Sequence, residues 1–109
     1  MAMDALPGYR KVTPSDRLQE GWVYPHYFDD VKRRVSIARV AGTLYAFDDL
    51  CSHDAAPLSA GLLSGTTLMC QCDGSQFDIT SGQVVRGPAV TKLETYPVLE
   101  AEGDILVRL

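Results

Sequence analysis

The sequence of 109 residues lacks any apolar run approaching the roughly 18 residues that a membrane-spanning helix needs. Residues 1–10 also lack the charged start and following apolar stretch of a secretory signal. A long helical hydrophobic period, an internal repeat and a low-complexity segment are missing as well. With 46% hydrophobic and 22% charged residues, the composition is typical of one globular domain over residues 1–109. We therefore expect a cytoplasmic protein with no membrane partner.

Cationic side chains are absent from a long part of the second half. Between Cys51 and Val85 there is no Lys or Arg, whereas Asp54, Asp73 and Asp78 all fall there. The formal net charge of -4 arises entirely after residue 50. This distribution argues against binding to nucleic acid or anionic lipid. A basic protein partner would suit it, although mild acidity that only aids solubility explains it equally well.

The chain has only three Cys, and this odd number argues against a disulfide framework in a cytoplasmic protein. All three fall in two short segments, Cys51-Ser52-His53 and Cys70-Gln71-Cys72-Asp73. Thiolates are soft metal ligands, imidazole is intermediate, and carboxylates are harder. The two segments therefore predict a metal site built from two loops.

The remaining pattern predicts an all-β fold of short strands with turn residues between them. A hairpin is expected over 35–40 and 43–47, with Ala41-Gly42 as its turn. Thr13 to Asp16 resembles a helix start and predicts one short turn to about Gln19. Other strands are expected at 6–12, 22–24 up to an interruption at Pro25, 67–69, 77–79, 83–85, 93–99 and 104–109.

The residues around both loops make the pattern more specific. The first loop is followed by Ala56-Pro57-Leu58-Ser59-Ala60-Gly61, the second by Gly74-Ser75-Gln76-Phe77-Asp78, and Gly87-Pro88-Ala89 comes later. This region resembles the cluster-binding region of Rieske [2Fe-2S] proteins, in which two Cys hold one iron and two His hold the other. The resemblance implies a Rieske-like fold, with an antiparallel β base formed by both ends of the chain and an inserted cluster-binding lobe from about residue 50 to 89.

By this resemblance, Cys51 and Cys70 would hold one iron of a [2Fe-2S] cluster and His53 the other. Asp73 stands where the family has its second His. A carboxylate Oδ lies as many bonds from Cα as the imidazole Nδ1, so Asp73 could be the fourth ligand. Cys72 is the alternative candidate for the fourth ligand. A scaffold that holds zinc or no metal is a further alternative, although the one-residue ligand spacings fit structural zinc poorly.

The resemblance also assigns residues around the cluster. Gly74 would let backbone N–H groups approach the cluster sulfides, Ser75 matches a serine whose hydroxyl lies near the cluster sulfurs, and Pro88 belongs to a loop that shields the cluster from water. Phe77 stands where family members of high potential have a Tyr. Together with the negative charge of Asp73, this predicts a potential below the usual Rieske range.

The function that the resemblance implies is that of a soluble one-electron carrier, a Rieske-type ferredoxin. It would pass electrons from a flavin-dependent reductase to a terminal oxygenase and would not itself be an enzyme. One alternative is a non-redox accessory module without a cluster that binds a partner enzyme. Another is a redox or metal sensor that uses Cys72 as a reactive thiol.

Overall fold

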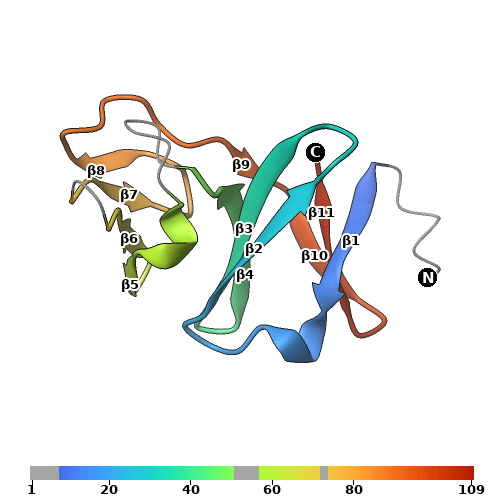
Figure 1. Cartoon of the computed structure of the whole chain (residues 1–109). Coiled ribbons are helices and arrows are strands. Elements are labelled where there is room, and N and C mark those ends of the chain that lie inside the picture. The colour runs from blue at the N-terminus through green and yellow to red at the C-terminus, as the bar shows by residue number, and fades with distance from the viewer. Residues whose placement is uncertain (1–7, 51–56, 72–73) are drawn as a thin grey trace.

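The computed structural model describes residues 8–50, 57–71 and 74–109, and it confirms the all-β class. The strands form three antiparallel sheets (Figure 1). The terminal sheet has the order β1 (Tyr9–Pro14), β11 (Asp104–Arg108) and β10 (Val98–Ala101). The central sheet has the order β2 (Val23–Phe28), β3 (Arg33–Val40), β4 (Thr43–Asp48) and β9 (Thr95–Tyr96).

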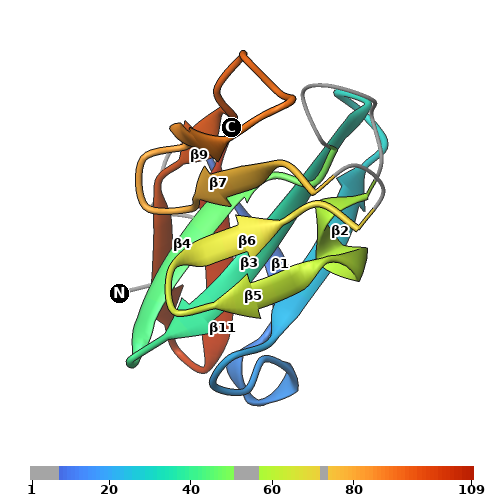
Figure 2. The same ribbon diagram turned by 90° about the vertical axis from the view of Figure 1, so that its left-hand side faces the viewer.

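The third sheet, which we call the lobe sheet, has the order β5 (Leu62–Ser64), β6 (Thr67–Met69), β7 (Gln76–Asp78) and β8 (Val84–Arg86). These strands come between β4 and β9 in the chain and lie over the central sheet (Figure 2). The helical elements of the described residues are two short 3-10 turns, η2 (Ser15–Arg17) and η3 (Leu58–Ala60). The expected architecture, a β base from both chain ends with an inserted lobe, is confirmed.

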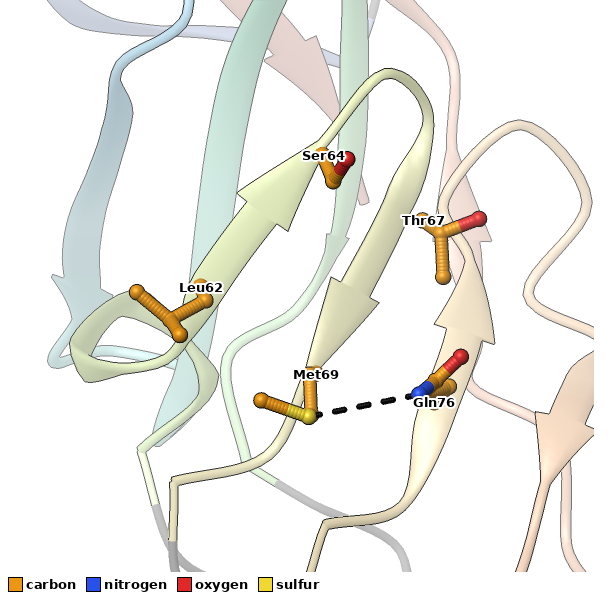
Figure 3. A pocket seen from close by; sticks show the side chains of 5 residues that line it. All are labelled: Leu62, Ser64, Thr67, Met69 and Gln76. Atoms are coloured by element: carbon orange, nitrogen blue, oxygen red, sulfur yellow. Dashed lines mark hydrogen bonds between the residues drawn. The ribbon is translucent and has the colours of Figure 1, made fainter.

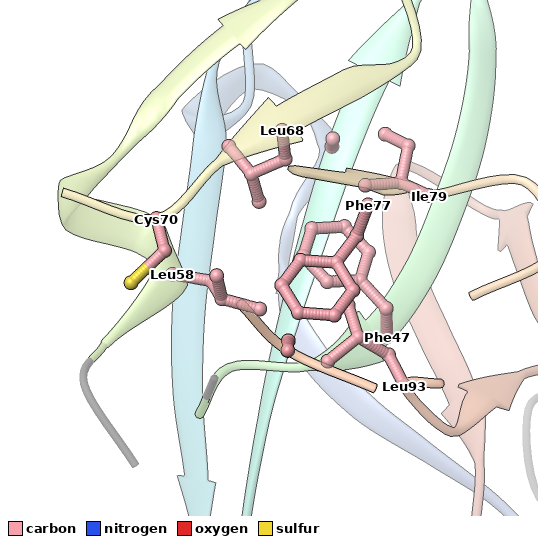
Figure 4. Close-up of a cluster of buried hydrophobic side chains, with 9 residues drawn as sticks. Phe47, Leu58, Leu68, Cys70, Phe77, Ile79 and Leu93 are labelled. Carbon is pink, nitrogen blue, oxygen red and sulfur yellow. The ribbon is translucent and has the colours of Figure 1, made fainter. Parts of the chain in front are cut away.

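The central sheet separates two hydrophobic cores because neighbouring side chains along a strand point to opposite faces. Ile37 and Ala46 face the terminal sheet and pack with Ile105 and Val107 in the terminal core. Ala38 and Phe47, the next residue in each strand, face the lobe sheet. In the lobe core they pack with these buried residues: Leu58, Leu68, Cys70, Phe77, Ile79, Ala89 and Leu93 (Figure 4).

The hairpin of β3 and β4 forms as expected. Ala41 and Gly42 both have positive φ, 52° and 80°, as a two-residue turn that matches the twist of its strands requires. Glu20 accepts hydrogen bonds from the backbone N–H groups of Ala41 (2.6 Å) and Gly42 (3.0 Å). These hydrogen bonds, that of Gly42 first and that of Ala41 second, favour the ionised carboxylate and hold the pKa of Glu20 below its usual range.

Three expectations about local structure were wrong. Pro25 does not interrupt β2, because β2 is an edge strand of the central sheet and needs no N–H for a second neighbour at that position. The expected strand over 93–99 divides at Pro97 into β9 and β10, which belong to different sheets. The expected short turn is present as η2, but Thr13 and Pro14 belong to β1, so the turn covers only Ser15–Arg17 and does not reach Gln19.

Candidate metal centre

The second loop is closed by backbone hydrogen bonds at its base. The N–H of Cys70 donates to the carbonyl of Ser75 at 2.7 Å, and the N–H of Gly74 donates to the carbonyl of Cys70 at 3.0 Å. Gly74 has a φ of +78°, in the left-handed region that a residue with a Cβ rarely adopts. Cys72 and Asp73 lie outside the described residues. The described ends therefore form a tight turn that begins at Cys70.

Cys70 is buried, with 1% of its surface exposed. Its neighbours in the lobe core include Leu58 and Leu68. In Figure 4 its Sγ points away from the rings of Phe47 and Phe77, which lie deeper in the lobe core. The thiol of Cys70 thus lies at the border between the lobe core and the second loop.

Ser75 joins the second loop to the segment that contains Pro88. Its side chain is fully buried, and its Oγ accepts a hydrogen bond from the backbone N–H of Ala89 at 3.0 Å. Ala89 is buried, whereas Pro88 is exposed. The structure therefore brings Cys70, Gly74 and Ser75 into one turn and anchors the residue after Pro88 to it.

The first loop follows β4, and Cys51 and His53 lie outside the described residues. The residues on either side of the undescribed stretch, Leu50 and Pro57, form an antiparallel bridge. Asp49 is fully buried, and its backbone carbonyl accepts a hydrogen bond from the N–H of Leu58. The two ends of this loop are therefore held together at its base.

Gly61 allows the turn that follows the first loop to approach the strand that leads to Cys70. A Cβ at Gly61 would lie 2.1 Å from the carbonyl oxygen of Met69, a distance that real Cβ atoms do not show. Only glycine fits this contact without a shift of backbone. The absence of a side chain at Gly61 thus brings η3 next to β6.

A polar cluster lies at Asp48, on the face of β4 opposite to that of Phe47. The hydroxyl of Tyr96 donates to Oδ1 of Asp48 at 2.5 Å and accepts a hydrogen bond from Arg33 at 3.1 Å. Burial, with the hydrogen bond to Asp48 second, raises the pKa of Tyr96 to about 12. This cluster fastens β9 to β4 at the end of the central sheet.

Tyr96 is expected to remain protonated in the folded protein at a pH at which an unfolded tyrosine, with a pKa of about 10, has already ionised. Because folding raises the pKa of Tyr96, the contribution of its protonated hydroxyl to the stability of the folded protein is fully present below about pH 10. This contribution is lost as the pH rises toward about 12. Denaturation of the wild type and Tyr96→Phe between these pH values measures the effect. The wild type should lose stability more steeply than Tyr96→Phe. Tyr27→Phe, at an exposed tyrosine of β2, is the control, and parallel curves for wild type and Tyr96→Phe would contradict the assignment.

The outer face of the lobe sheet carries an open hollow of about 410 Å³. Its lining residues are Leu62, Ser64, Thr67, Met69 and Gln76 (Figure 3). The lining includes no acid, base or thiol, so it offers no side chain that could transfer a proton or activate the hydroxyls of Ser64 and Thr67 for nucleophilic attack. We therefore place the candidate site at the loops of the lobe and not at this hollow.

The described residues contain only part of the expected site. Within residues 8–50, 57–71 and 74–109, no group of three or more His, Cys, Asp or Glu side chains could hold a metal ion. Three of the four expected metal ligands, Cys51, His53 and Asp73, fall outside these ranges, so their roles stay predictions. The sequence reasoning missed Asp49 and its partners. The adjacent acids Asp48 and Asp49, directly before the first loop, were the only available signal.

The fold and the site together define a class of protein, in which a small antiparallel β base carries an inserted lobe with a cysteine-containing loop. A family model described as "Rieske [2Fe-2S] domain" matches residues 9–97. The chain therefore belongs to the Rieske [2Fe-2S] domain family, and its cofactor is a [2Fe-2S] cluster.

Several known proteins are similar to this chain. The ferredoxin component of the naphthalene 1,2-dioxygenase system of Pseudomonas aeruginosa is 35% identical over 72 residues, which are 66% of this chain and 68% of the relative. The ferredoxin component of the naphthalene 1,2-dioxygenase/salicylate 5-hydroxylase systems of Ralstonia sp is 28% identical over 84% of this chain and 99% of the relative. A chain in the complex of reduced oxygenase and oxidized ferredoxin in carbazole 1,9a-dioxygenase is 27% identical, with a TM-score of 0.86 and 93% of both chains covered.

The described residues fit a [2Fe-2S] cluster. Cys70 would supply a sulfur donor at the start of a turn that Gly74 and Ser75 close. An apolar core lies behind this cysteine, and a dry shell of this kind influences the potential of a metal centre. Among the described residues no helix is long and apolar enough to cross a membrane.

Proposed function

We propose that this chain is a one-electron carrier, a Rieske-type ferredoxin of a multicomponent oxygenase system. It would accept electrons from a flavin-dependent reductase and pass them to a terminal oxygenase. The cluster supplies the redox chemistry when bound, and the protein binds it, limits its access to water and presents it to partners. The cytoplasmic location belongs to the same proposal.

The observation that carries the proposal is the extent of the match to ferredoxin components. The Ralstonia relative, a ferredoxin component, is matched over 99% of its length. The structural match covers 93% of a chain in a complex of oxygenase and ferredoxin. These names support an oxygenase as partner. The reductase is supported more weakly, because it is implied only by the naming of the relatives as components of dioxygenase systems.

We further propose that Cys51 and Cys70 bind one iron, and that His53 and Asp73 bind the other. Cys70 is the member of this set that the structure describes, and its burial at the base of the second turn supports a ligand role. The other three lie outside the described residues, as does the rival Cys72. Their assignment rests on the sequence pattern and on the chemistry of their side chains.

Ser75, Gly74 and Pro88 have supporting roles in this proposal. The Oγ of Ser75 holds Ala89, and with it the segment of Pro88, against the second turn. Gly74 provides the left-handed backbone conformation of that turn. These residues would keep the second loop in one shape in both oxidation states and reduce the access of water.

Anaerobic purification followed by metal and sulfide analysis tests the function directly. We expect a brown protein with about two iron and two acid-labile sulfide per chain, since this is the composition of the cluster. Mixing it with a flavin-dependent reductase and NADH, or NADPH, should bleach its visible absorption, and a terminal oxygenase should restore the colour. A colourless protein from iron-sufficient cells would instead support the accessory module, and a zinc content would support a structural metal.

A further inference from the structure

Asp49 is a fully buried charged side chain that lies next to the first loop. None of its surface is exposed, and it lies two positions before Cys51. A carboxylate out of contact with water is unfavourable unless charge and hydrogen bonds compensate it. Both are present, since Arg34 donates from Nε to Oδ2, and Ser36 donates from Oγ to Oδ1 at 2.7 Å.

The third partner of Asp49 comes from the lobe. The backbone N–H of Ser59, in η3, donates to Oδ1 at 2.8 Å. Arg34 and Ser36 belong to β3 of the central sheet, so one carboxylate joins the base to the first turn after the loop. Ser59 is ten positions from Asp49, and the undescribed residues 51–56 lie between them.

Two backbone contacts reinforce this junction. The N–H of Leu58 donates to the carbonyl of Asp49, and Leu50 is bridged to Pro57. We call the contacts of Asp49 with Ser36, Leu58 and Ser59 the Asp49 clasp. The clasp fixes the two ends of the first loop at one distance from each other and from the central sheet.

Asp48 provides an internal comparison because it is the same residue type in the adjacent position. Side chains alternate along the chain, so Asp48 points to the other side and accepts its hydrogen bond from Tyr96 of β9. The hydrogen bonds of its side chain therefore reach the central sheet and not η3. A change at Asp48 perturbs charge and stability at nearly the same place without opening the junction to the lobe.

We propose that Asp49 is a positioning residue that holds the two described ends of the first ligand loop together and thereby favours retention of the cluster. Its consequence for the cluster rests on the proposed ligands Cys51 and His53. Because the two ends of the loop are joined on folding and not only when the cluster binds, the clasp should slow the loss of the cluster. A carboxylate suits this position because it accepts several hydrogen bonds at once, including one from a cation.

The test compares Asp49→Asn, Ser36→Ala, Asp48→Asn and the wild type, all as purified with their cofactor. Cluster loss in the presence of an iron chelator is followed by visible absorption. Asp49 contacts none of the proposed ligands among the described residues; if it acts as strongly as the hydrogen-bond partners of metal ligands, whose loss costs about 10–100-fold in metal affinity, Asp49→Asn should lose its cluster about tenfold faster or more. Ser36→Ala should show a smaller increase, and Asp48→Asn should stay within about twofold of the wild type. Equal rates for Asp49→Asn and Asp48→Asn would overturn the proposal.

Amide hydrogen exchange separates the clasp from general stability and from the proposed function. In Asp49→Asn, exchange should rise at least about tenfold at Leu58 and Ser59, but much less in β10 and β11. A uniform rise across all three sheets would show a purely structural role and would overturn the proposal. A wild type without iron would contradict the proposed function. The exchange at Leu58 and Ser59 would then be the only test of the clasp. Ser36→Ala keeps the test decisive if Asp49→Asn fails to fold.

Discussion

Replacing Asp73 by His is expected to raise the midpoint potential by about 150–200 mV. If Asp73 is the fourth ligand, as we propose, its carboxylate in place of a neutral imidazole gives the oxidised centre an additional negative charge, which repels the incoming electron. Two unit charges about 4 Å apart interact by about 4 kcal/mol at an effective dielectric constant of about 20, and this energy corresponds to the shift for a one-electron couple. Removing the charge by Asp73→His therefore favours the reduced form. Redox titration of both proteins under argon measures it.

The matched variant is Cys72→Ser, which alters the neighbouring residue without changing the proposed ligand set. If Asp73 is the fourth ligand, Cys72→Ser should keep the spectrum of the wild type and its potential within about 30 mV. If Cys72 is the ligand, the outcome is reversed: Cys72→Ser disturbs the cluster, and Asp73→His leaves the potential nearly unchanged. A wild-type potential above about 0 mV would also contradict a carboxylate ligand.

Phe47→Ala is expected to reduce the free energy of unfolding by about 3–5 kcal/mol, the usual cost of removing a fully buried phenylalanine ring. None of the surface of Phe47 is exposed. Its ring extends from the central sheet into the lobe core beside Phe77 (Figure 4). The cavity would therefore open between the base and the lobe. Chemical denaturation monitored by circular dichroism measures the loss.

Val90→Ala is the control for this variant, since Val90 is 91% exposed. Its free energy of unfolding should differ from that of the wild type by no more than about 0.5 kcal/mol. A loss below about 1 kcal/mol for Phe47→Ala would mean that the lobe packs on the base less tightly than the structure indicates.

Much of the fold could be predicted because its information is local. The alternation over 35–40 and 43–47 and the turn at Ala41-Gly42 predicted the hairpin of β3 and β4 correctly. Strands β6, β7 and β8 were also recognised from short runs between turn residues. Pro25 was misjudged because the position of a strand at the edge of a sheet depends on distant parts of the chain.

The site could be predicted only in part, for the same reason. Cys70, Gly74 and Ser75 are neighbours in the sequence and in the structure, so their turn followed from the pattern. The role of Asp49 could not be foreseen, because its partners Arg34, Ser36 and Ser59 are 15, 13 and 10 positions away. Short β-type runs also gave no sign of η3 and β5, whose approach to β6 depends on Gly61.

The central sheet is packed on both faces, by the terminal sheet on one and by the lobe on the other, so the last strand of the chain affects the lobe indirectly. Ile105 and Val107 of the last strand support Ile37 and Ala46, and the residues next to these two in β3 and β4 carry the lobe. Deleting the residues after β10 would remove β11, and with it the side chains that pack against the central sheet on the face opposite to the lobe. We therefore expect truncation at that end to bleach the protein, although it removes none of the proposed ligands.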